Sequence, residues 1–263
     1  MPDQVNFADC YVLTNQRTHA FLLSFLDHFL PQREAYATSF EVPQHADPPQ
    51  QVFTTAEDLI AYLESHSNEV HAIYWENKET SQLRAAMCLF TSDGQVIVGL
   101  TSETRYPDAS IERKYLKQLE QFCNSSLSLI EYDTPAAKDT IAFVQRIEQQ
   151  VKKLIEKIYD VFNKRDIPSA LQAMLPDVQW PNGWEGGYVY GHDAVKDYWI
   201  RQWKEIDPHV QPISVKLETD GRIRVLVQQN VKDKQGKLLH EGQVTHVYTL
   251  EAGLIKHMLI EKS

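Results

Sequence analysis

The sequence predicts an α+β protein of two domains, in which helices pack on antiparallel sheets. Short β-rich runs alternate with amphipathic helical stretches in the first half of the chain. The second half begins with a long amphipathic helix and ends in three long strand-like runs. A chain of 263 residues is also more typical of two modest domains than of one large domain. We therefore expect a small acidic α+β domain at residues 1–132 and a second domain at residues 133–263.

The first domain is expected to open with a strand followed by a helix. Residues 9–14 form a short β-rich run. Residues 17–30 then carry apolar side chains at helical spacing, at Phe21, Leu22, Phe25 and Phe29. After a loop broken by several prolines, Thr55 begins a capping box ahead of a second, short helix.

Three strands and a third helix are expected to complete this domain. The strands are predicted at residues 70–77, 83–91 and 95–102. Asp93-Gly94 joins the last two, and this dipeptide favours the tight turn of an antiparallel hairpin. After Pro107, apolar side chains recur at helical spacing, at Ile111, Tyr115, Leu119 and Phe122.

The second domain is expected to begin with one long helix. Thr134 is predicted as its N-cap and Pro135 as its first helical residue. One apolar stripe follows, formed by Val144, Ile147, Val151, Leu154, Ile155, Ile158 and Phe162. A short helix at residues 167–175, an aromatic segment and a third helix starting near His192 come next.

The remainder of the second domain is predicted to be sheet. Strands are expected at residues 221–231, 237–250 and 254–262. Turns at Gln235-Gly236 and Ala252-Gly253 separate them, so the three strands should form an antiparallel meander.

Charge is distributed unevenly along the chain. Residues 1–140 contain nine Lys or Arg and twenty Asp or Glu, a net charge of −11, whereas the rest is nearly neutral. Neither half has the dense basic patch that a phosphate backbone requires, which argues against nucleic acid as a partner. The acidic half could bind a basic protein partner, or could be an ordinary solvated surface. No apolar run approaches the ~20 residues of a membrane span, and no secretory leader is recognisable, so we expect a cytoplasmic protein without a membrane partner.

Motifs for metals, cofactors and nucleophilic catalysis are missing from the sequence. Cys10, Cys88 and Cys123 are widely spaced, which argues against a disulfide framework or a cysteine zinc site. No HxxxH or HxH pair occurs, and the Gly-rich stretch at residues 183–187 lacks the spacing of a phosphate loop. The GxSxG nucleophile elbow does not occur either. We therefore expect no metal and no cofactor.

The order of elements in the second half resembles the SnoaL-like branch of the nuclear transport factor two superfamily. The resemblance covers residues 141–262, and the stretches at 178–208 and 244–260 are similar to a bacterial subfamily. It implies a cone-shaped domain whose helices pack on a strongly curved antiparallel sheet around an apolar cavity. It also implies a homodimer, because the outer face of such sheets commonly dimerises. Related cones bind steroids, polyketides or other small molecules, and some have no catalytic role.

Ketosteroid isomerase is the mechanistic template nearest to this branch, and its roles can be compared residue by residue. The position of its carboxylate base resembles Trp180, which cannot accept a proton. The position of its oxyanion tyrosine falls on Ile158, with Tyr159 turned about a hundred degrees around the helix. The second oxyanion donor falls on His246. Because the base is missing, the resemblance does not imply isomerase activity.

His246 is the candidate catalytic residue, since the resemblance directs it into the cavity and a histidine can act as acid, base or donor near neutral pH. Strand alternation puts His240 and Tyr248 on the same face as His246. Aromatic residues near the expected mouth and one polar residue of a strand complete the site. The candidate ligand-binding residues are Trp180, Trp184, Tyr188, Tyr190, Trp199, Gln228, His240 and Tyr248.

Two functions remain open from sequence. In the first, the second domain binds a small apolar or aromatic molecule and His246 catalyses acid–base chemistry on it. In the second, the protein is a non-catalytic interaction protein: the acidic first domain binds a protein partner and the cone is a scaffold for dimerisation. Whether the protein is an enzyme is left undecided by these patterns.

Overall fold

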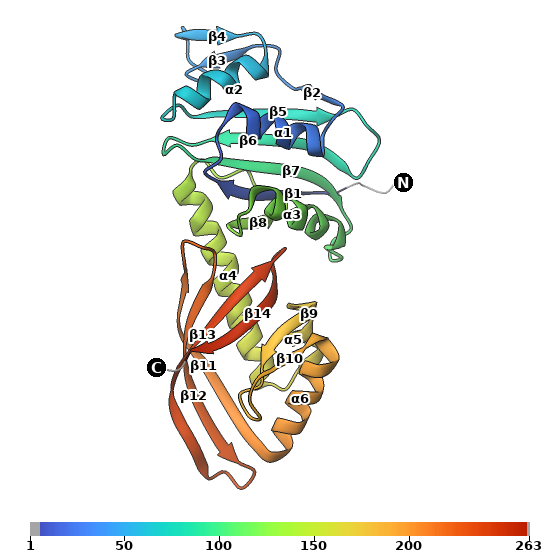
Figure 1. Ribbon diagram of the computed structural model, residues 1–263, viewed down its shortest axis with the longest axis vertical. Coiled ribbons are helices and arrows are strands. Elements are labelled where there is room, and N and C mark those ends of the chain that lie inside the picture. The colour runs from blue at the N-terminus through green and yellow to red at the C-terminus, as the bar shows by residue number, and fades with distance from the viewer. Residues whose placement is uncertain (1–5, 262–263) are drawn as a thin grey trace. The chain divides into compact units, whose positions relative to one another are not determined.

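The computed structural model describes residues 6–261 of the chain. The chain divides into two compact units, Met1–Ile147 and Glu148–Ser263, and each unit contains one six-stranded sheet (Figure 1). The boundary expected from sequence, at residue 132, precedes this division. Residues 133–147, which lie between the two boundaries, pack with the first unit. The Phe143 ring lies 6.4 Å from that of Tyr11, and Arg146 pairs with Glu131 at 2.8 Å.

The N-terminal unit has a sheet with strand order β2-β5-β6-β7-β1-β8, in which all neighbours are antiparallel. Its strands are β1 (Asn6–Thr14), β2 (Arg33–Ala35), β5 (His71–Asn77), β6 (Leu83–Phe90), β7 (Val96–Thr104) and β8 (Ser128–Glu131). A separate small ribbon consists of β3 (Phe40–Val42) and β4 (Gln51–Phe53). The helices are α1 (His19–Phe29), α2 (Ala56–Ser65) and α3 (Ser110–Cys123). This arrangement confirms the predicted α+β class.

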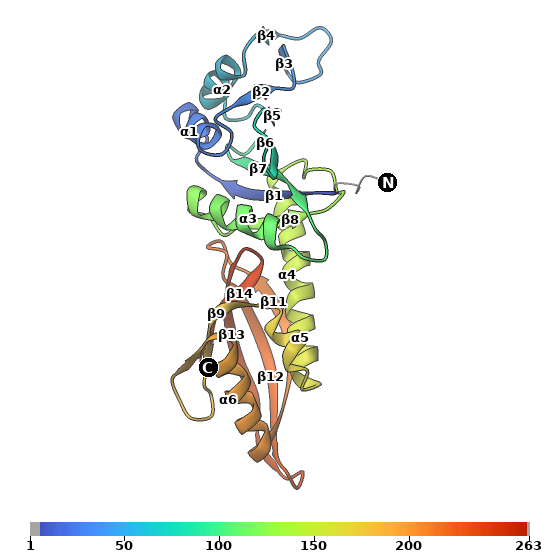
Figure 2. The ribbon, with the colours of Figure 1, turned by 90° about the vertical axis from the view of Figure 1, so that its right-hand side faces the viewer.

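Only one face of this sheet is covered by α1, α2 and α3 (Figure 2). Side chains alternate along each strand, so Cys10 and Val12 join the core beneath the helices while Tyr11 points to the opposite face. As predicted, the hydroxyl of Thr55 accepts a hydrogen bond from the backbone N–H of Asp58, at 3.1 Å, and caps α2.

Arg17, three residues after the end of β1, joins several loops of this unit. Its side chain is only 6% exposed, and its guanidinium stacks over the Phe90 ring at 5.0 Å. It donates hydrogen bonds of 2.7–3.2 Å to the backbone carbonyls of Leu63, His66, Glu69, Thr91 and Gln95. One buried cation therefore satisfies carbonyl groups at the end of α2, in the loop after it and in the β6–β7 turn.

The long helix α4 (Thr140–Asn163) begins later than the sequence predicts. The carboxylate of Asp139 accepts a hydrogen bond from the backbone N–H of Ala142 at 2.7 Å, so Asp139 caps the helix. The predicted cap, Thr134, instead donates its hydroxyl proton to the carbonyl of Tyr132. Pro135 therefore lies in an irregular segment before α4.

The C-terminal unit has a sheet with strand order β10-β9-β14-β13-β12-β11. Its strands are β9 (Met174–Pro181), β10 (Tyr188–Tyr190), β11 (Ile206–Leu217), β12 (Ile223–Asp233), β13 (Leu238–Glu251) and β14 (Leu254–Glu261). The helices that follow α4 are α5 (Ile167–Leu171) and α6 (Gly191–Glu205). The last three strands form the predicted antiparallel meander. Only β9 and β14 pair in parallel among the described neighbours.

Strand β11 was not predicted, because it contains Pro208 and Pro212. Proline has no N–H to donate and is confined to edge strands, and β11 is the edge of this sheet. The outward backbone groups of Val210 are bound by the side-chain amide of Asn163, at 2.7 and 3.0 Å. The carbonyl of Pro208 accepts a 2.9 Å hydrogen bond from Arg165.

Three further findings concern residues 6–261. Cys10, Cys88 and Cys123 are buried free thiols, and burial raises the pKa of each. No cluster of three or more His, Cys, Asp or Glu side chains in this range is arranged to hold a metal ion. None of the helices in this range has both the length and the apolar character needed to cross a membrane.

Candidate functional site

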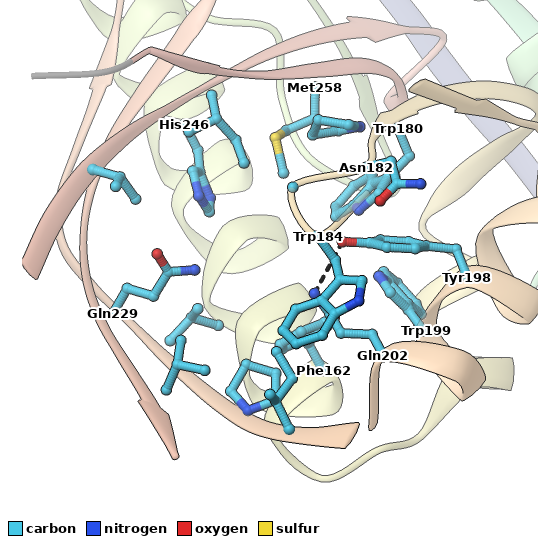
Figure 3. A pocket seen from close by; sticks show the side chains of 18 of the residues that line it. Phe162, Trp180, Asn182, Trp184, Tyr198, Trp199, Gln202, Gln229, His246 and Met258 are labelled. Atoms are coloured by element: carbon cyan, nitrogen blue, oxygen red, sulfur yellow. Dashed lines mark hydrogen bonds between the residues drawn. The ribbon is translucent and has the colours of Figure 1, made fainter. Parts of the chain in front are cut away.

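The C-terminal unit encloses a cavity of about 830 Å³ between α4, α6 and the inner face of its sheet. We call it the C-terminal cavity. Figure 3 shows side chains pointing into it from separate elements: Phe162 from α4, Trp180 from β9 and Trp199 from α6. The volume lies within the roughly 300–1,000 Å³ that small-molecule sites typically have.

Aromatic rings packed edge to face form one wall of the C-terminal cavity. The Trp199 ring lies 5.4 Å from those of Trp180 and Phe162, with interplanar angles of 89° and 75°. Trp199 is only 1% exposed because the apolar stripe of α6, with Val195, faces the sheet. Such T-shaped contacts are favourable for aromatic quadrupoles and fix the orientation of each ring.

A chain of three hydrogen-bonding side chains lies at the buried end of the C-terminal cavity. The Tyr248 hydroxyl donates to the Tyr159 hydroxyl at 2.9 Å, and the Tyr159 hydroxyl lies 2.7 Å from Nδ1 of His246. In the arrangement in which Tyr159 donates its proton to Nδ1, the neutral imidazole carries its own proton on Nε2. Nε2 is buried and has no hydrogen-bond partner among the described residues.

Burial keeps all three groups of this chain neutral. It lowers the pKa of His246 to about 4 and raises the pKa of Tyr159 and of Tyr248 far above neutrality. At neutral pH the imidazole is therefore a weak base, and its Nε2–H is a hydrogen-bond donor. The arrangement can bind an acceptor oxygen, and negative charge developing on that oxygen would strengthen the bond.

Acid is expected to destabilise the C-terminal unit through His246. Above pH 6.5 the ring is neutral in both the folded and unfolded states. Below pH 6.5 the unfolded state binds a proton on His246. The folded state does not bind this proton until the pH reaches its pKa of about 4. The free energy of unfolding should therefore fall by about 3 kcal/mol between pH 6.5 and pH 4. Urea unfolding of the protein and of His246→Leu across this range measures the difference, and equal pH slopes would contradict the assignment.

A short loop between β9 and β10 forms the more exposed end of the C-terminal cavity. The Asn182 side chain accepts a hydrogen bond from the backbone N–H of Glu185 and donates one to its carboxylate, both at 2.8 Å. Glu185 also pairs with Arg201 on α6 at 3.1 Å, so Arg201 is engaged at the surface. Trp184 and Tyr188 are 48% and 40% exposed. The cavity therefore has an exposed opening lined by aromatic rings and a buried end lined by polar side chains.

Comparison with known proteins identifies this domain. Residues 155–258 match the family model described as the SnoaL-like domain. The C-terminal unit contains a SnoaL-like domain. This result confirms the family resemblance seen in the sequence and the predicted fold of helices on a curved antiparallel sheet. No curated protein matches the chain.

Three solved structures similar to the SnoaL-like domain each cover less than half of the chain. A nuclear-transport-factor-two-like protein of unknown function from Burkholderia pseudomallei is 25% identical, with 43% of this chain and 91% of that chain covered and a TM-score of 0.39. A putative polyketide cyclase from Xanthomonas campestris is 17% identical, with 44% and 92% covered and a TM-score of 0.39. RV0760c from Mycobacterium tuberculosis, in complex with estradiol-17beta-hemisuccinate, is 16% identical, with 43% and 94% covered and a TM-score of 0.39.

Most of the residues proposed from sequence for this site do line the cavity of the SnoaL-like domain. These are Trp180, Trp184, Tyr188, Trp199, His240, His246 and Tyr248. Tyr190 is not among the lining residues: it is the last residue of β10, directly before Gly191, and is 65% exposed. Gln228 does not line the cavity either. Val225 and Val227 are fully buried at every second position of β12, and this register puts Gln229 on the cavity wall in place of Gln228.

Several lining residues of the SnoaL-like domain were not proposed from sequence. Tyr159 is the most informative of them, because it holds His246 by a hydrogen bond. Its position was available from helical spacing, since it lies four residues after the buried Ile155 and one helical turn before Phe162. Asn182, Tyr198, Gln202, Gln229 and Met258 also line the cavity, and Gln202 donates to the Tyr198 hydroxyl at 2.9 Å.

The lining of this cavity constrains the chemistry of the SnoaL-like domain. Among the described residues that line it there is no Asp, Glu, Lys or Arg. The titratable groups in contact with the cavity are the imidazoles of His240 and His246 and the tyrosine hydroxyls. The cavity therefore offers an apolar body with a few neutral donors and acceptors, as small-molecule sites commonly do.

Proposed function

We propose that the SnoaL-like domain binds a small, mainly apolar or aromatic molecule that carries an acceptor oxygen, and that His246 binds this oxygen. The observation that carries the proposal is the buried and unpartnered Nε2 of His246, a residue that lines the C-terminal cavity. A buried polar group without a partner is rare in proteins and indicates a partner that is supplied from outside the chain. A carbonyl or ether oxygen would complete the hydrogen-bond chain from Tyr248 through Tyr159.

The remaining walls suit an apolar ligand body. Trp180, Trp199 and Phe162 offer aromatic faces, and Met258 adds an adaptable thioether to the lining. A charged ligand is not supported, because no charged side chain lines the cavity among the described residues. The polar side chain of Gln229 on β12 could fix the orientation of a second polar group.

Binding, rather than turnover, is the activity that this geometry supports best. Acid–base catalysis requires a group that changes its protonation state near the working pH, whereas burial holds the pKa of His246 near 4. The position where the isomerase template has its carboxylate base is Trp180, which is buried against Trp199. A hydrogen bond from His246 could still stabilise an oxyanion if the ligand itself provides the base.

Removing the His246 donor is expected to weaken binding about tenfold for ligands with a carbonyl oxygen, since a lost hydrogen bond costs ~1 kcal/mol or more. A steroid, flavonoid and polyketide library screened by intrinsic tryptophan fluorescence would supply ligands. Each ligand should then be compared with its analogue that lacks the oxygen. His246→Leu should abolish the difference within each pair, and Tyr159→Phe should reduce it because Nδ1 loses its donor.

Tyr190→Phe is the matched control, because this exposed tyrosine does not line the cavity and its removal should leave every affinity unchanged. The proposal fails if no library member changes the fluorescence or the melting temperature. It also fails if the carbonyl compounds bind His246→Leu as tightly as they bind the unaltered protein.

A second candidate function is a non-catalytic interaction protein. The net charge of −11 in residues 1–140 favours a basic protein partner for the N-terminal unit. In this proposal the C-terminal unit forms a homodimer through exposed apolar residues of its sheet, such as Ile213 and Leu238. Analytical ultracentrifugation of the protein and of Ile213→Glu would test the dimer, which should dissociate in the variant.

A further inference from the structure

We propose that the N-terminal unit binds an organic cation, an ammonium or guanidinium group on an aliphatic stem, in a cavity on the sheet face opposite its helices. This N-terminal cavity has a volume of about 590 Å³. It lies over β1, β6 and β7 and is bounded by residues 133–136 after β8. The inference is independent of the ligand proposed for the C-terminal unit.

A row of side chains across neighbouring strands forms the floor of the N-terminal cavity. Tyr74, Met87, Gly99 and Tyr11 are directly opposite one another in register across β5, β6, β7 and β1. A Cβ atom on Gly99 would lie 2.8 Å from both Met87 and Tyr11. Glycine at this position therefore allows the two larger side chains to meet above the strand and close the floor with an apolar and aromatic surface.

One carboxylate without a cationic partner lines this floor. Asp9 accepts a 2.6 Å hydrogen bond from the Thr101 hydroxyl and a weak one, at 3.4 Å, from the Tyr11 hydroxyl. Both donors are neutral, and a carboxylate has about four acceptor sites, so capacity for a further donor remains. No Lys, Arg or His pairs with Asp9 in the part of the chain between residues 6 and 261. Burial raises the pKa of Asp9, which agrees with a charge that lacks compensation.

The other charged groups at the N-terminal cavity do not neutralise the carboxylate of Asp9. Arg84 lines the cavity, but its guanidinium is engaged with Glu103. Glu131, near Asp9, is paired with Arg146. Asp133 also lines the cavity and adds a second carboxylate at the loop. A cation is therefore the ligand that complements the charge here, whereas an anion would be repelled.

Aromatic side chains at the rim favour a cation with an apolar stem. Phe7, Tyr36 and Tyr74 line the cavity and are each at least 40% exposed. Tyr36 and Tyr74 are held side by side because the Tyr36 backbone N–H donates to the Tyr74 carbonyl at 3.0 Å. Aromatic faces attract ammonium and guanidinium groups, and they also pack against the methylene stem of such a group.

The test uses the full chain and three small probes. Nα-acetyl-lysine methylamide presents the ammonium group as a protein side chain, and cadaverine presents it as a free amine. Nα-acetyl-norleucine methylamide has a similar side chain without the charge. Backbone amide shifts of Asp9, Tyr11, Gly99 and Thr101, followed by nuclear magnetic resonance, should move in a saturable way with a cationic probe and not with the norleucine compound.

Asp9→Asn should weaken binding of the cationic probe about tenfold, because the variant keeps the shape of the side chain and loses the charge. Tyr74→Leu should weaken binding about threefold through the lost aromatic face, and it provides the test if Asp9→Asn does not fold. Glu79→Gln is the matched control, since it removes one exposed charge of the same unit outside the cavity and should change little.

Preference for the lysine compound would indicate a protein side chain as the natural source, and preference for cadaverine would indicate a free amine; both support a cation site. Binding of the norleucine compound with equal affinity would overturn the proposal. So would an equal loss in Glu79→Gln and Asp9→Asn, or the absence of saturable shifts with both cationic probes. None of these results bears on the His246 experiment, since the two cavities lie in different units.

Discussion

Replacing Trp199 with alanine is expected to lower the free energy of unfolding of the C-terminal unit by about 4 kcal/mol. The indole is buried and packs against the rings of Phe162, Trp180 and Trp203. The substitution would therefore remove apolar contacts of α6 with both α4 and β9 and enlarge a cavity that already exists. Urea unfolding followed by far-ultraviolet circular dichroism measures the loss without depending on tryptophan emission.

Trp184→Ala is the matched control for this experiment. Trp184 also lines the C-terminal cavity but is 48% exposed, so its removal should cost less than about 1 kcal/mol. Both variants remove a tryptophan from the cavity lining, but only Trp199→Ala should destabilise the fold. A loss of similar size in the two variants would show that Trp199 does not hold the wall together as its contacts indicate.

Arg17→Ala is expected to destabilise the N-terminal unit by about 3–5 kcal/mol, because each buried carbonyl left without a donor costs about 1–3 kcal/mol. The guanidinium serves five backbone carbonyls from three parts of the chain, and alanine would leave these without their donor. Arg17→Lys should lose most of the same free energy, because a single ammonium group cannot reproduce the planar fork of donors. Thermal unfolding monitored by circular dichroism would measure both variants.

Arg33 provides the comparison for Arg17. Its side chain is 16% exposed and donates to the exposed carboxylate of Asp27, at 2.7 Å, and to a single backbone carbonyl, that of Leu30, at 3.2 Å, so its removal should cost about 1–2 kcal/mol. Arg33→Ala should therefore lower the melting temperature much less than Arg17→Ala does. If Arg17→Ala lowered the melting temperature as little as Arg33→Ala, water would have to replace the guanidinium at the carbonyl groups. The prediction that Arg17 stabilises the N-terminal unit would then be wrong.

Much of the architecture follows from hydrophobic periodicity, and the exceptions have physical causes. The meander of β12, β13 and β14 was predicted because its strands are long, apolar on one face and separated by turns at glycines with positive φ, as at Gly236 and Gly253. The start of α4 was misplaced because proline at a helix start is a statistical preference, whereas a cap depends on which side chain reaches the free N–H groups. The homodimer and the cytoplasmic location stay predictions.

The candidate site was predicted less completely than the fold. Which side chains face a cavity depends on the exact register of each strand as well as on the residue types. Gln228 drew attention as a polar residue in an apolar strand, yet its neighbour Gln229 shares the face of Val225 and Val227. The family resemblance points to His246, strand alternation puts His240 and Tyr248 on its face, and all three line the cavity. The contact between Tyr159 and His246 joins residues 87 positions apart, and periodicity along one element cannot reveal such a pairing.

The occupied outer edge of β11 bears on the behaviour of the protein at high concentration. An unprotected edge strand offers donors and acceptors on which a strand of another molecule can grow into a continuous intermolecular sheet. Here Pro208 and Pro212 lack the donor, Asn163 takes both groups of Val210, and Arg165 takes the Pro208 carbonyl. The same two prolines that hide this strand in the sequence thus help to prevent edge-to-edge aggregation and domain swapping along residues 208–212.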